Sequence, residues 1–229
     1  MNTVKKHFVN FILLFSSLTT IVAQTTTKAE SSDPKAKVIL DKLKKQYESY
    51  QSLDATFSLT IESSGSKISE KNTGKISQQG DKYRLETDRE LIICDGKTVW
   101  LYLKDKNQVQ ISDADPKDKN AIISPKQIMK MYDNKDFIYS LAGEGTEATK
   151  TCSFIEFKPV KKNSDYTKLR MAVDKSSQVV SIKAFSRDAS RYTMQINSLK
   201  PNPPRYATNY FGFDKNDHKG VKIEDLRID

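Results

Sequence analysis

The first regular pattern of hydrophobic positions spans residues 34–51. Apolar side chains, among them Ala36, Leu40 and Leu43, recur at intervals of three and four, and lysines occupy many of the positions between them. This spacing predicts one amphipathic helix with a lysine-rich outer face. Pro34 suits the first turn of that helix, because its missing N–H would have no intrahelical partner there.

Beyond residue 53 the hydrophobic period falls to two, which is typical of β-strands. In the clearest case Phe57, Leu59 and Ile61 alternate with hydroxylated residues. About ten short runs of this kind, joined by turn residues, predict a large antiparallel sheet rather than alternating βαβ units. Besides residues 53–61, the runs contain Ile76; Tyr83 and Leu85; residues 91–94; residues 98–103; Val109 and Ile111; residues 152–157; Leu169, Met171 and Val173; residues 179–185; Tyr192, Met194 and Ile196; and Phe211 and Phe213. Residues 200–205, KPNPPR, are predicted to be a loop, because proline cannot serve a central strand.

A second helical stretch is predicted to begin at Ser124 and to end before Gly143. Ile128, Met129 and Tyr132 share one side of it. This helix is inserted between two groups of strands.

The N-terminal residues have the pattern of a secretory signal peptide. Lys5 and Lys6 precede an apolar run over residues 8–18, and Ala23 offers a small residue before a cleavage site. Because the run is too short for a membrane-spanning helix, we expect residues 1–23 to be removed on export.

The composition of the remaining chain indicates a tether and one domain, and its charge pattern bears on the class of ligand. Residues 24–33 are polar enough to serve as a flexible tether, and residues 34–229 have the length of one domain. Two of the 38 basic residues and none of the 29 acidic residues precede Gln24, so the exported chain carries 36 against 29, a formal charge of +7. Its lysines are interleaved with acidic residues and form no stripe, which argues against nucleic-acid binding.

Residue types that carry chemistry are sparse. After the signal peptide His218 is the one histidine, so neither a nucleophile–base pair nor a zinc site can be assembled convincingly. We therefore expect no enzymatic activity, no cofactor and no metal. Cys94 and Cys152 leave two alternatives open: a disulfide, which export permits, or two small core residues.

Residues 91–105, LIICDGKTVWLYLKD, hold the chain's single tryptophan. The tripeptide GKT within them resembles the end of a phosphate-binding loop, but Leu91 stands where that loop needs its first glycine. Asp95 and Gly96 lie between two apolar runs and instead predict a hairpin with a type I′ turn, which needs a positive φ at both central residues.

The strand after this turn is apolar on both of its faces. Trp100 and Tyr102 share one face, and Val99, Leu101 and Leu103 share the other. A strand of this kind must be covered on both sides. Two alternatives follow: a sheet packed on both sides, or a curved sheet whose inner side, closed by the two helices, encloses an apolar cavity.

Residues 95–102, DGKTVWLY, resemble the DGK-T-hydrophobic-W-x-Y signature of LolA, the periplasmic lipoprotein carrier family of diderm bacteria. The resemblance spans essentially the whole exported chain. Four further segments stand where the family has similar ones: LDATFSLTI at 53–61, GKISQQGDKYRLE at 74–86, SPKQIMKMY at 124–132 in the place of the lid helix, and FDKNDHKGVKIEDLR at 213–227.

The resemblance implies a mostly β (α+β) fold, an incomplete and strongly curved antiparallel β-barrel with a helical lid over a hydrophobic cavity. It also implies a monomeric carrier in the periplasm. Such a carrier takes lipoproteins from an inner-membrane lipoprotein-releasing ABC transporter, shields their acyl chains and ferries them to the outer membrane without covalent chemistry. The resemblance does not identify the acceptor at the outer membrane.

Strand alternation then assigns the expected cavity wall, with Trp100 placed on the cavity side. One error of register would exchange the two faces of every strand. The expected lid residues are Ile128, Met129 and Tyr132. The expected wall residues are Phe57, Leu59, Ile61, Tyr83, Leu85, Ile93, Trp100, Tyr102, Met171 and Met194.

The chain also departs from the family in two places. Residues 78–81, QQGD, stand where many members carry an arginine tied to lid closure and lipoprotein transfer, and residues 214–217 replace the closing prolines. Two other functions therefore stay open. One is binding of another lipid or hydrophobic small molecule, and the other is a structural adaptor that uses its sheet edges and has no cavity.

Overall fold

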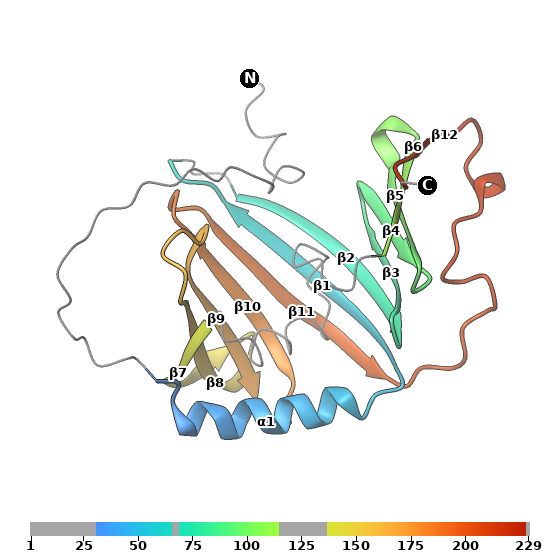
Figure 1. Cartoon of the computed structure of the whole chain (residues 1–229). Helices are drawn as coiled ribbons and strands as arrows, with labels where there is room; N and C mark the ends of the chain where they lie inside the picture. The colour runs from blue at the N-terminus through green and yellow to red at the C-terminus, as the bar shows by residue number, and fades with distance from the viewer. Residues whose placement is uncertain (1–30, 66–68, 115–136, 228–229) are drawn as a thin grey trace.

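The protein folds as one curved, open β-sheet with a helix against it. The structure is a computed structural model and describes residues 31–65, 69–114 and 137–227. Within these ranges twelve strands form one sheet, and one α-helix crosses it (Figure 1). The elements are α1 (Pro34–Glu48), β1 (Ser52–Glu62), β2 (Ser69–Gln79), β3 (Lys82–Thr87), β4 (Glu90–Cys94), β5 (Thr98–Leu103), the 3₁₀ turn η2 (Lys104–Lys106), β6 (Gln108–Asp113), β7 (Phe137–Glu147), β8 (Lys150–Pro159), β9 (Tyr166–Asp174), β10 (Val179–Ser186), β11 (Arg191–Pro201), the 3₁₀ turn η3 (Lys215–Asp217) and β12 (Lys222–Asp225).

The order of the strands joins two antiparallel meanders. It runs β12-β6-β5-β4-β3-β2-β1-β11-β10-β9-β8-β7. The long strands β1 and β11 pair from Leu53 opposite Pro201 to Glu62 opposite Arg191 and hold the two meanders together. The sheet does not close into a barrel, because β12 and β7 are its two ends, and β12 pairs with β6 in parallel rather than antiparallel.

Helix α1 confirms the first pattern in the sequence, although it ends three residues earlier than expected. Asp33 caps it by accepting a hydrogen bond from the backbone N–H of Lys35 at 2.8 Å, and Pro34 occupies the first turn. The backbone N–H of Asp33 also donates to the carbonyl of Tyr139. This bond fastens the start of the helix to the edge strand β7.

The side of the sheet that α1 contacts, here the helix side, contains the larger core. Ala36, Leu40 and Leu43 of α1 are completely buried there. They pack against strands β7 to β10, where residues that oppose one another across the ladders point to the same side. The register gives one unbroken apolar row from β1 to β7, made of Leu59, Met194, Ile182, Met171, Ile155 and Leu141.

A second apolar row on the helix side crosses the other meander. It is made of directly opposed residues on β1 to β5, namely Ala55, Ile76, Leu85, Ile92 and Leu101. The partly buried Met194 and Ile196 of β11 contact both cores. The helix side is therefore apolar across most of the sheet.

The opposite side of β2 to β6, here the far side, is covered by the C-terminal segment, residues 202–221. Tyr210 Oη lies 2.9 Å from Ser77 Oγ, and Tyr206 Oη donates to Asp54 Oδ1 at 2.8 Å. Beneath this segment Ile93 is 1% exposed. The segment takes the place that a second layer would have.

Three sequence-based predictions of structure were wrong. Residues 137–147 form strand β7 with both glycines inside it, not the end of a helix. Phe211 and Phe213 lie in the C-terminal segment rather than in a strand, and the last strand is β12. Residues 200–205 were expected to be a loop throughout, but β11 continues to Pro201, which lies at a strand end where a missing N–H is tolerated.

The predicted hairpin between β4 and β5 is confirmed, but its turn differs from the expected one. Gly96 has a φ of 97°, whereas Asp95 does not have a positive φ, so the turn is not type I′. The side chain of Asp95 instead accepts hydrogen bonds from the backbone N–H groups of Lys97 and Thr98, both at 2.8 Å. A side-chain acceptor here does part of the work that the expected backbone conformation would do.

The predicted signal peptide, residues 1–23, and most of the predicted tether lie outside the described residues. The predicted lid, with Ile128, Met129 and Tyr132, lies outside them as well. No helix in the described ranges is long and apolar enough to cross a membrane.

Candidate apolar binding surface on the helix side of the sheet

The strand register places seven of the ten expected wall residues on one side of the sheet. Phe57 opposes Ile196 and Gly74, and the row through Ile76 carries this orientation to β3. The seven residues on the helix side are Phe57, Leu59, Ile61, Tyr83, Leu85, Met171 and Met194.

The other three expected wall residues point to the far side, so the ten residues do not share one side of the sheet as expected. Ile93 opposes Arg84 and Trp100, and Tyr102 opposes Leu91. On β5 the helix side is instead occupied by Val99, Leu101 and Leu103. The sequence could not predict the side of Trp100 and Tyr102, because both faces of this strand are apolar and alternation alone does not tell which face turns inward.

Exposure on the helix side differs between the two meanders. Beneath α1, Ile155 is 0% exposed and Met171 is 2% exposed, so this half is filled core. Over β1 and β3 to β5, by contrast, apolar side chains remain partly exposed to solvent. These are Leu59, Ile61, Tyr83, Ile92, Val99, Leu101 and Leu103. We call this set the open apolar surface.

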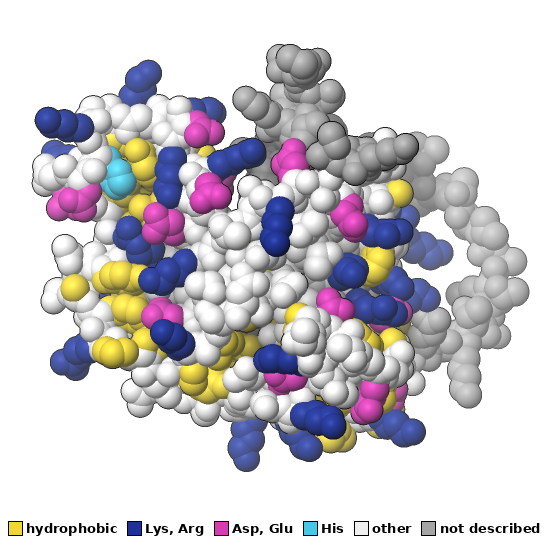
Figure 2. Space-filling model, turned by 180° about the vertical axis from the view of Figure 1, so that it is seen from behind, with side chains coloured by type: hydrophobic (Ala, Val, Ile, Leu, Met, Phe, Trp, Pro, Cys, Tyr) yellow, Lys and Arg dark blue, Asp and Glu magenta, His cyan; other side chains and the backbone are white. Residues whose placement is uncertain are grey.

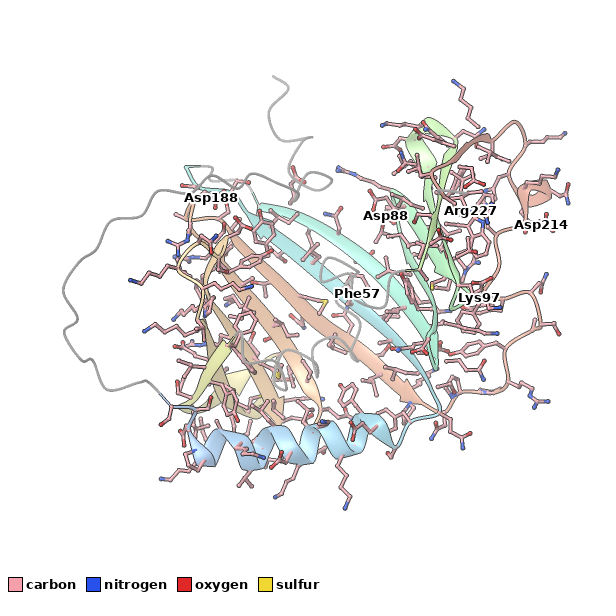
Figure 3. The ribbon with its side chains drawn as sticks, viewed as in Figure 1. Phe57, Asp88, Lys97, Asp188, Asp214 and Arg227 are labelled. Carbon is pink, nitrogen blue, oxygen red and sulfur yellow. The ribbon has the colours of Figure 1, made fainter. Side chains whose placement is uncertain are left out.

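Phe57 lies near the middle of the helix side, in the buried cluster with Ala55, Ile76 and Leu85 (Figure 3). Its ring lies over Gly74 of β2, where a Cβ atom would come within 2.3 Å of the ring. Phe57 is itself buried, at 8% exposed. A glycine at this position lets the aromatic ring lie flat on the neighbouring strand.

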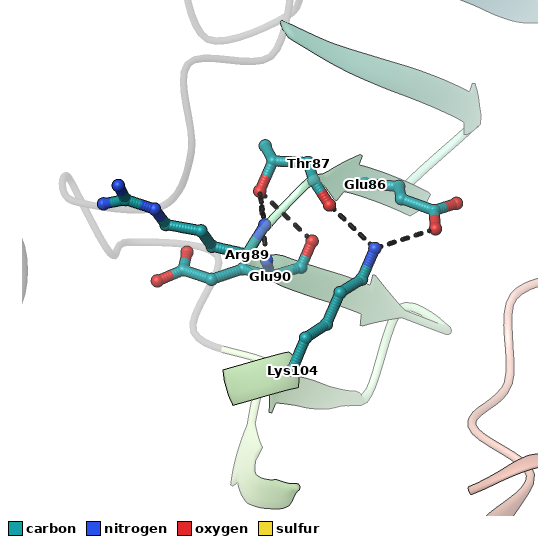
Figure 4. Close-up of polar contacts among 5 residues, drawn as sticks. All are labelled: Glu86, Thr87, Arg89, Glu90 and Lys104. Carbon is teal, nitrogen blue, oxygen red and sulfur yellow. Dashed lines mark hydrogen bonds and ion pairs between the residues drawn. The ribbon is translucent and has the colours of Figure 1, made fainter. Parts of the chain in front are cut away.

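A polar network borders the open apolar surface at the turn between β3 and β4 (Figure 4). Thr87 Oγ1 accepts hydrogen bonds from the backbone N–H groups of Arg89 and Glu90. Lys104 Nζ donates to Glu86 Oε1 at 3.1 Å and to the carbonyl of Thr87 at 2.7 Å. These bonds hold the turn between β3 and β4 to the end of β5.

Glu90 is the acidic residue of this rim that faces the helix side, opposite Leu103. Partial burial raises the pKa of its carboxyl group, and the neighbouring Arg89 acts weakly in the other direction. The rim therefore carries a carboxylate that is costly to bury in its charged form.

The far side of β5 and β6 has a separate open depression of about 460 Å³ under the C-terminal segment. Trp100, Ile111, Phe213 and Ile223 form its apolar walls. Next to it the His218 ring stacks on the ring of Phe213, with 4.7 Å between the two ring centres. Figure 2 shows apolar side chains gathered around the histidine. The sequence pattern does not indicate this arrangement, because Phe211 and Phe213 imitate strand alternation.

Cys94 and Cys152 do not form a disulfide, which decides between the two alternatives left open by the sequence. Cys94 lies on the helix side, opposite Tyr83, whereas Cys152 lies in a far-side cluster with Ala172 and Val180. Seven ladder steps separate β4 from β8. Burial raises the pKa of both thiols, so each behaves as a small core residue.

No cluster of three or more potential metal-ligating side chains occurs in the described part of the chain. What the helix side offers is a contiguous apolar area with a polar rim. Such a surface can bind hydrophobic chains without covalent chemistry.

The sequence profile of the family described as "Outer membrane lipoprotein carrier protein LolA" matches residues 48–214. The chain belongs to the LolA family. The match covers β1 to β11 and most of the C-terminal segment, and so includes both meanders of the sheet.

Individual proteins similar to this LolA-family chain are distant. It is 30% identical over 140 residues to the uncharacterized protein MJ0687 of Methanocaldococcus jannaschii, a match that covers 59% of this chain and 40% of that protein. A solved uncharacterized conserved protein from Thermus thermophilus is 12% identical with a TM-score of 0.54, and the match covers 83% of this chain and 99% of that one. This likeness shows a shared fold. The LolA superfamily protein NE2245 from Nitrosomonas europaea is 10% identical with a TM-score of 0.40, over 78% of this chain and 98% of that one.

The family arginine is absent from residues 78–81, and the structure shows where the nearest arginine of this chain lies. Arg84, the nearest arginine to residues 78–81, points to the far side, opposite Ser77. Its guanidinium donates to the carbonyl of Tyr210 and lies 5.5 Å from the centre of that ring. Arg84 thus fastens the C-terminal segment to the far side of the sheet.

Proposed function

We propose that this LolA-family protein is a periplasmic carrier that binds the acyl chains of lipoproteins released from the inner membrane and delivers them toward the outer membrane. Its inner-membrane partner would be a lipoprotein-releasing ABC transporter, and binding would involve no covalent step. Family membership supports the general role. The observation that carries the proposal is the open apolar surface on β1 and β3 to β5.

The arrangement of that surface suits a linear hydrophobic ligand. Opposed residues on successive strands are about 4.5–5.5 Å apart, so the partly exposed Ile92 and Leu101 lie side by side. They continue an apolar row whose other members, Ala55, Ile76 and Leu85, are buried. Burial of each CH₂ group stabilises a bound chain by about 0.8 kcal/mol, or roughly 12 kcal/mol for sixteen carbons. This is enough to oppose return to a bilayer when a large part of the chain is covered.

We choose the binding residues by their side of the sheet and their exposure, so only the helix side of β5 contributes. Of the predicted wall residues, we assign the binding role to Leu59, Ile61 and Tyr83, which are partly exposed. Leu101 of β5 and its opposed neighbour Ile92 join them, because both are partly exposed on the helix side. Leu85 is buried in the core cluster at 8% exposed and supports the surface from beneath. Met171 lies beneath α1 at 2% exposed and supports the fold rather than the ligand.

Native mass spectrometry of the protein isolated from its own cells, followed by organic extraction, tests this proposal. An acylated N-terminal cysteine peptide or an intact lipoprotein in the extract is the expected result. Recovery of a free lipid or a pigment would keep the surface and reassign the cargo. A ligand-free mass, with no uptake of an added acylated peptide, would contradict a carrier role.

A pair of matched variants ties the uptake to the surface. Leu101→Asp places a charge on the open apolar surface, and we expect it to weaken acylated-peptide binding at least tenfold, because burying one leucine is worth about 1.5–3 kcal/mol. Leu226→Asp makes the same change at a residue that is 52% exposed beyond β12. Equal binding by the two variants would place the ligand elsewhere.

A further inference from the structure

The outward side of α1 carries a lysine stripe that the acyl-binding proposal does not use. Lys35, Val38, Lys42 and Lys45 follow one another at intervals of three and four residues and lie on one side of the helix. All four are exposed, and Val38 is 56% exposed. Figure 1 shows α1 along one edge of the molecule, with no described element on its outer side. We call these four residues the α1 stripe.

The acidic residues of α1 pair with lysines that do not belong to the α1 stripe. Both acidic residues of the helix form ion pairs with lysines outside the stripe: Asp41 with Lys37 at 2.8 Å, and Glu48 with Lys44 at 3.7 Å. No ion pair joins the three lysines of the stripe to any residue in the described ranges. The stripe thus presents three lysines that form no ion pair in the described ranges around one exposed apolar side chain, although the carboxylate of Asp33 acts on the charge of Lys35.

We propose that the α1 stripe docks the protein onto an anionic lipid surface. Long lysine side chains can reach phosphate groups while their stems and Val38 contact the apolar part of the interface. A stripe on a straight helix offers no recess for the buried aromatic or arginine anchors that concentrate affinity at protein interfaces. Charge complementarity without such a recess favours a diffuse anionic surface over an acidic protein.

The expected docking is weak and sensitive to salt. A lysine near an anionic leaflet strengthens binding about fivefold, so three of them contribute about a hundredfold. This attraction falls off within about 8 Å at physiological ionic strength. An attraction of this strength allows the protein to bind a membrane reversibly.

Flotation of the protein with vesicles tests the proposal. Vesicles of 70% phosphatidylcholine and 30% phosphatidylglycerol are compared with vesicles of phosphatidylcholine alone, at low and at high salt. The stripe variant combines Lys35→Gln, Lys42→Gln and Lys45→Gln. The control variant removes the same charge from exposed lysines on the far side of β2 and β11, with Lys71→Gln, Lys75→Gln and Lys200→Gln.

The proposal expects the wild-type and control proteins to float with anionic vesicles at low salt, and the stripe variant to lose about a hundredfold in apparent affinity. Because all three proteins share the same N-terminus, that segment does not affect the comparison. Equal losses in both variants would mean that net charge alone binds the membrane, and no flotation of the wild type would exclude lipid as the partner. Either result overturns the proposal. Uptake of a soluble acylated peptide should be the same in all three proteins, so failure of docking and failure of the carrier role are distinguishable.

Discussion

The ring of Phe57 on β1 occupies the space that a side chain at Gly74 of β2 would need. The two residues are directly opposed in the antiparallel ladder, and a Cβ atom at residue 74 would lie 2.3 Å from Cζ of the ring. Real Cβ contacts do not come this close, so the ring must move if residue 74 gains a methyl group. The sheet thereby couples a missing side chain on one strand to an aromatic ring on the next.

Replacement of this glycine should destabilise the fold. We expect Gly74→Ala to lower the free energy of unfolding by about 1–3 kcal/mol, the usual cost of overpacking. Denaturant unfolding measures the change. Gly212→Ala is the matched control, because its added Cβ would have ordinary contact at 3.5 Å. In the double variant Phe57→Leu, Gly74→Ala the two costs should not add, and strict additivity would contradict the coupling.

The two faces of β5 predict where a fluorescent reporter responds. Trp100 points to the far side, so its emission should stay unchanged when an acylated peptide binds. Transfer of the indole by one residue, with Trp100→Phe and Leu101→Trp, places it on the open apolar surface, where binding should shift its emission to shorter wavelength. A shift from native Trp100 and none from the transferred indole would reverse the assignment of the two faces.

Asp33 predicts a dependence of stability on pH. Hydrogen bonds from the backbone N–H groups of Leu141 and Lys35 lower the pKa of its carboxyl group below its ordinary value. Because the folded-state pKa is the lower one, this stabilisation is complete above pH of about 4 and is lost as pH falls through the folded-state pKa.

The melting temperature of Asp33→Asn, measured from pH 3 to pH 7, checks this dependence. Asparagine keeps an oxygen that can cap α1, but it does not titrate and cannot accept both hydrogen bonds equally well. We expect the wild type to be the more stable protein at pH 7 and its advantage to shrink toward pH 3. A constant difference in melting temperature over this range would show that titration of the Asp33 carboxylate does not affect stability.

The two cysteines predict slow alkylation. Burial raises the pKa of Cys94 and Cys152, so few thiolate anions are present at pH 8. Iodoacetamide should add little mass to the folded protein and two adducts after denaturation, with or without prior reduction. A requirement for reduction before the second adduct appears would indicate a disulfide.

Much of the fold follows from local patterns. The helix at Pro34–Glu48 and the strand through Phe57 have clear periods, and their predicted types are confirmed. Strand β7 was missed because its glycines at 143 and 145 imitate a helix end. Gly145 instead makes room for the ring of Phe154 on the next strand, a reason that local sequence does not contain.

The sequence by itself determined the amphipathic helix, most of the strands and, through the DGK segment, the LolA resemblance. These properties depend on residue period and on short motifs, which are local. Only the tertiary structure decided which side of β4 and β5 turns toward α1, that Cys94 and Cys152 stay apart, and that residues 202–221 cover the far side. Each of these depends on how segments far apart in sequence pair or pack together. With Trp100 and Leu101 both apolar, the side on which each is covered is set by the segments that pack there.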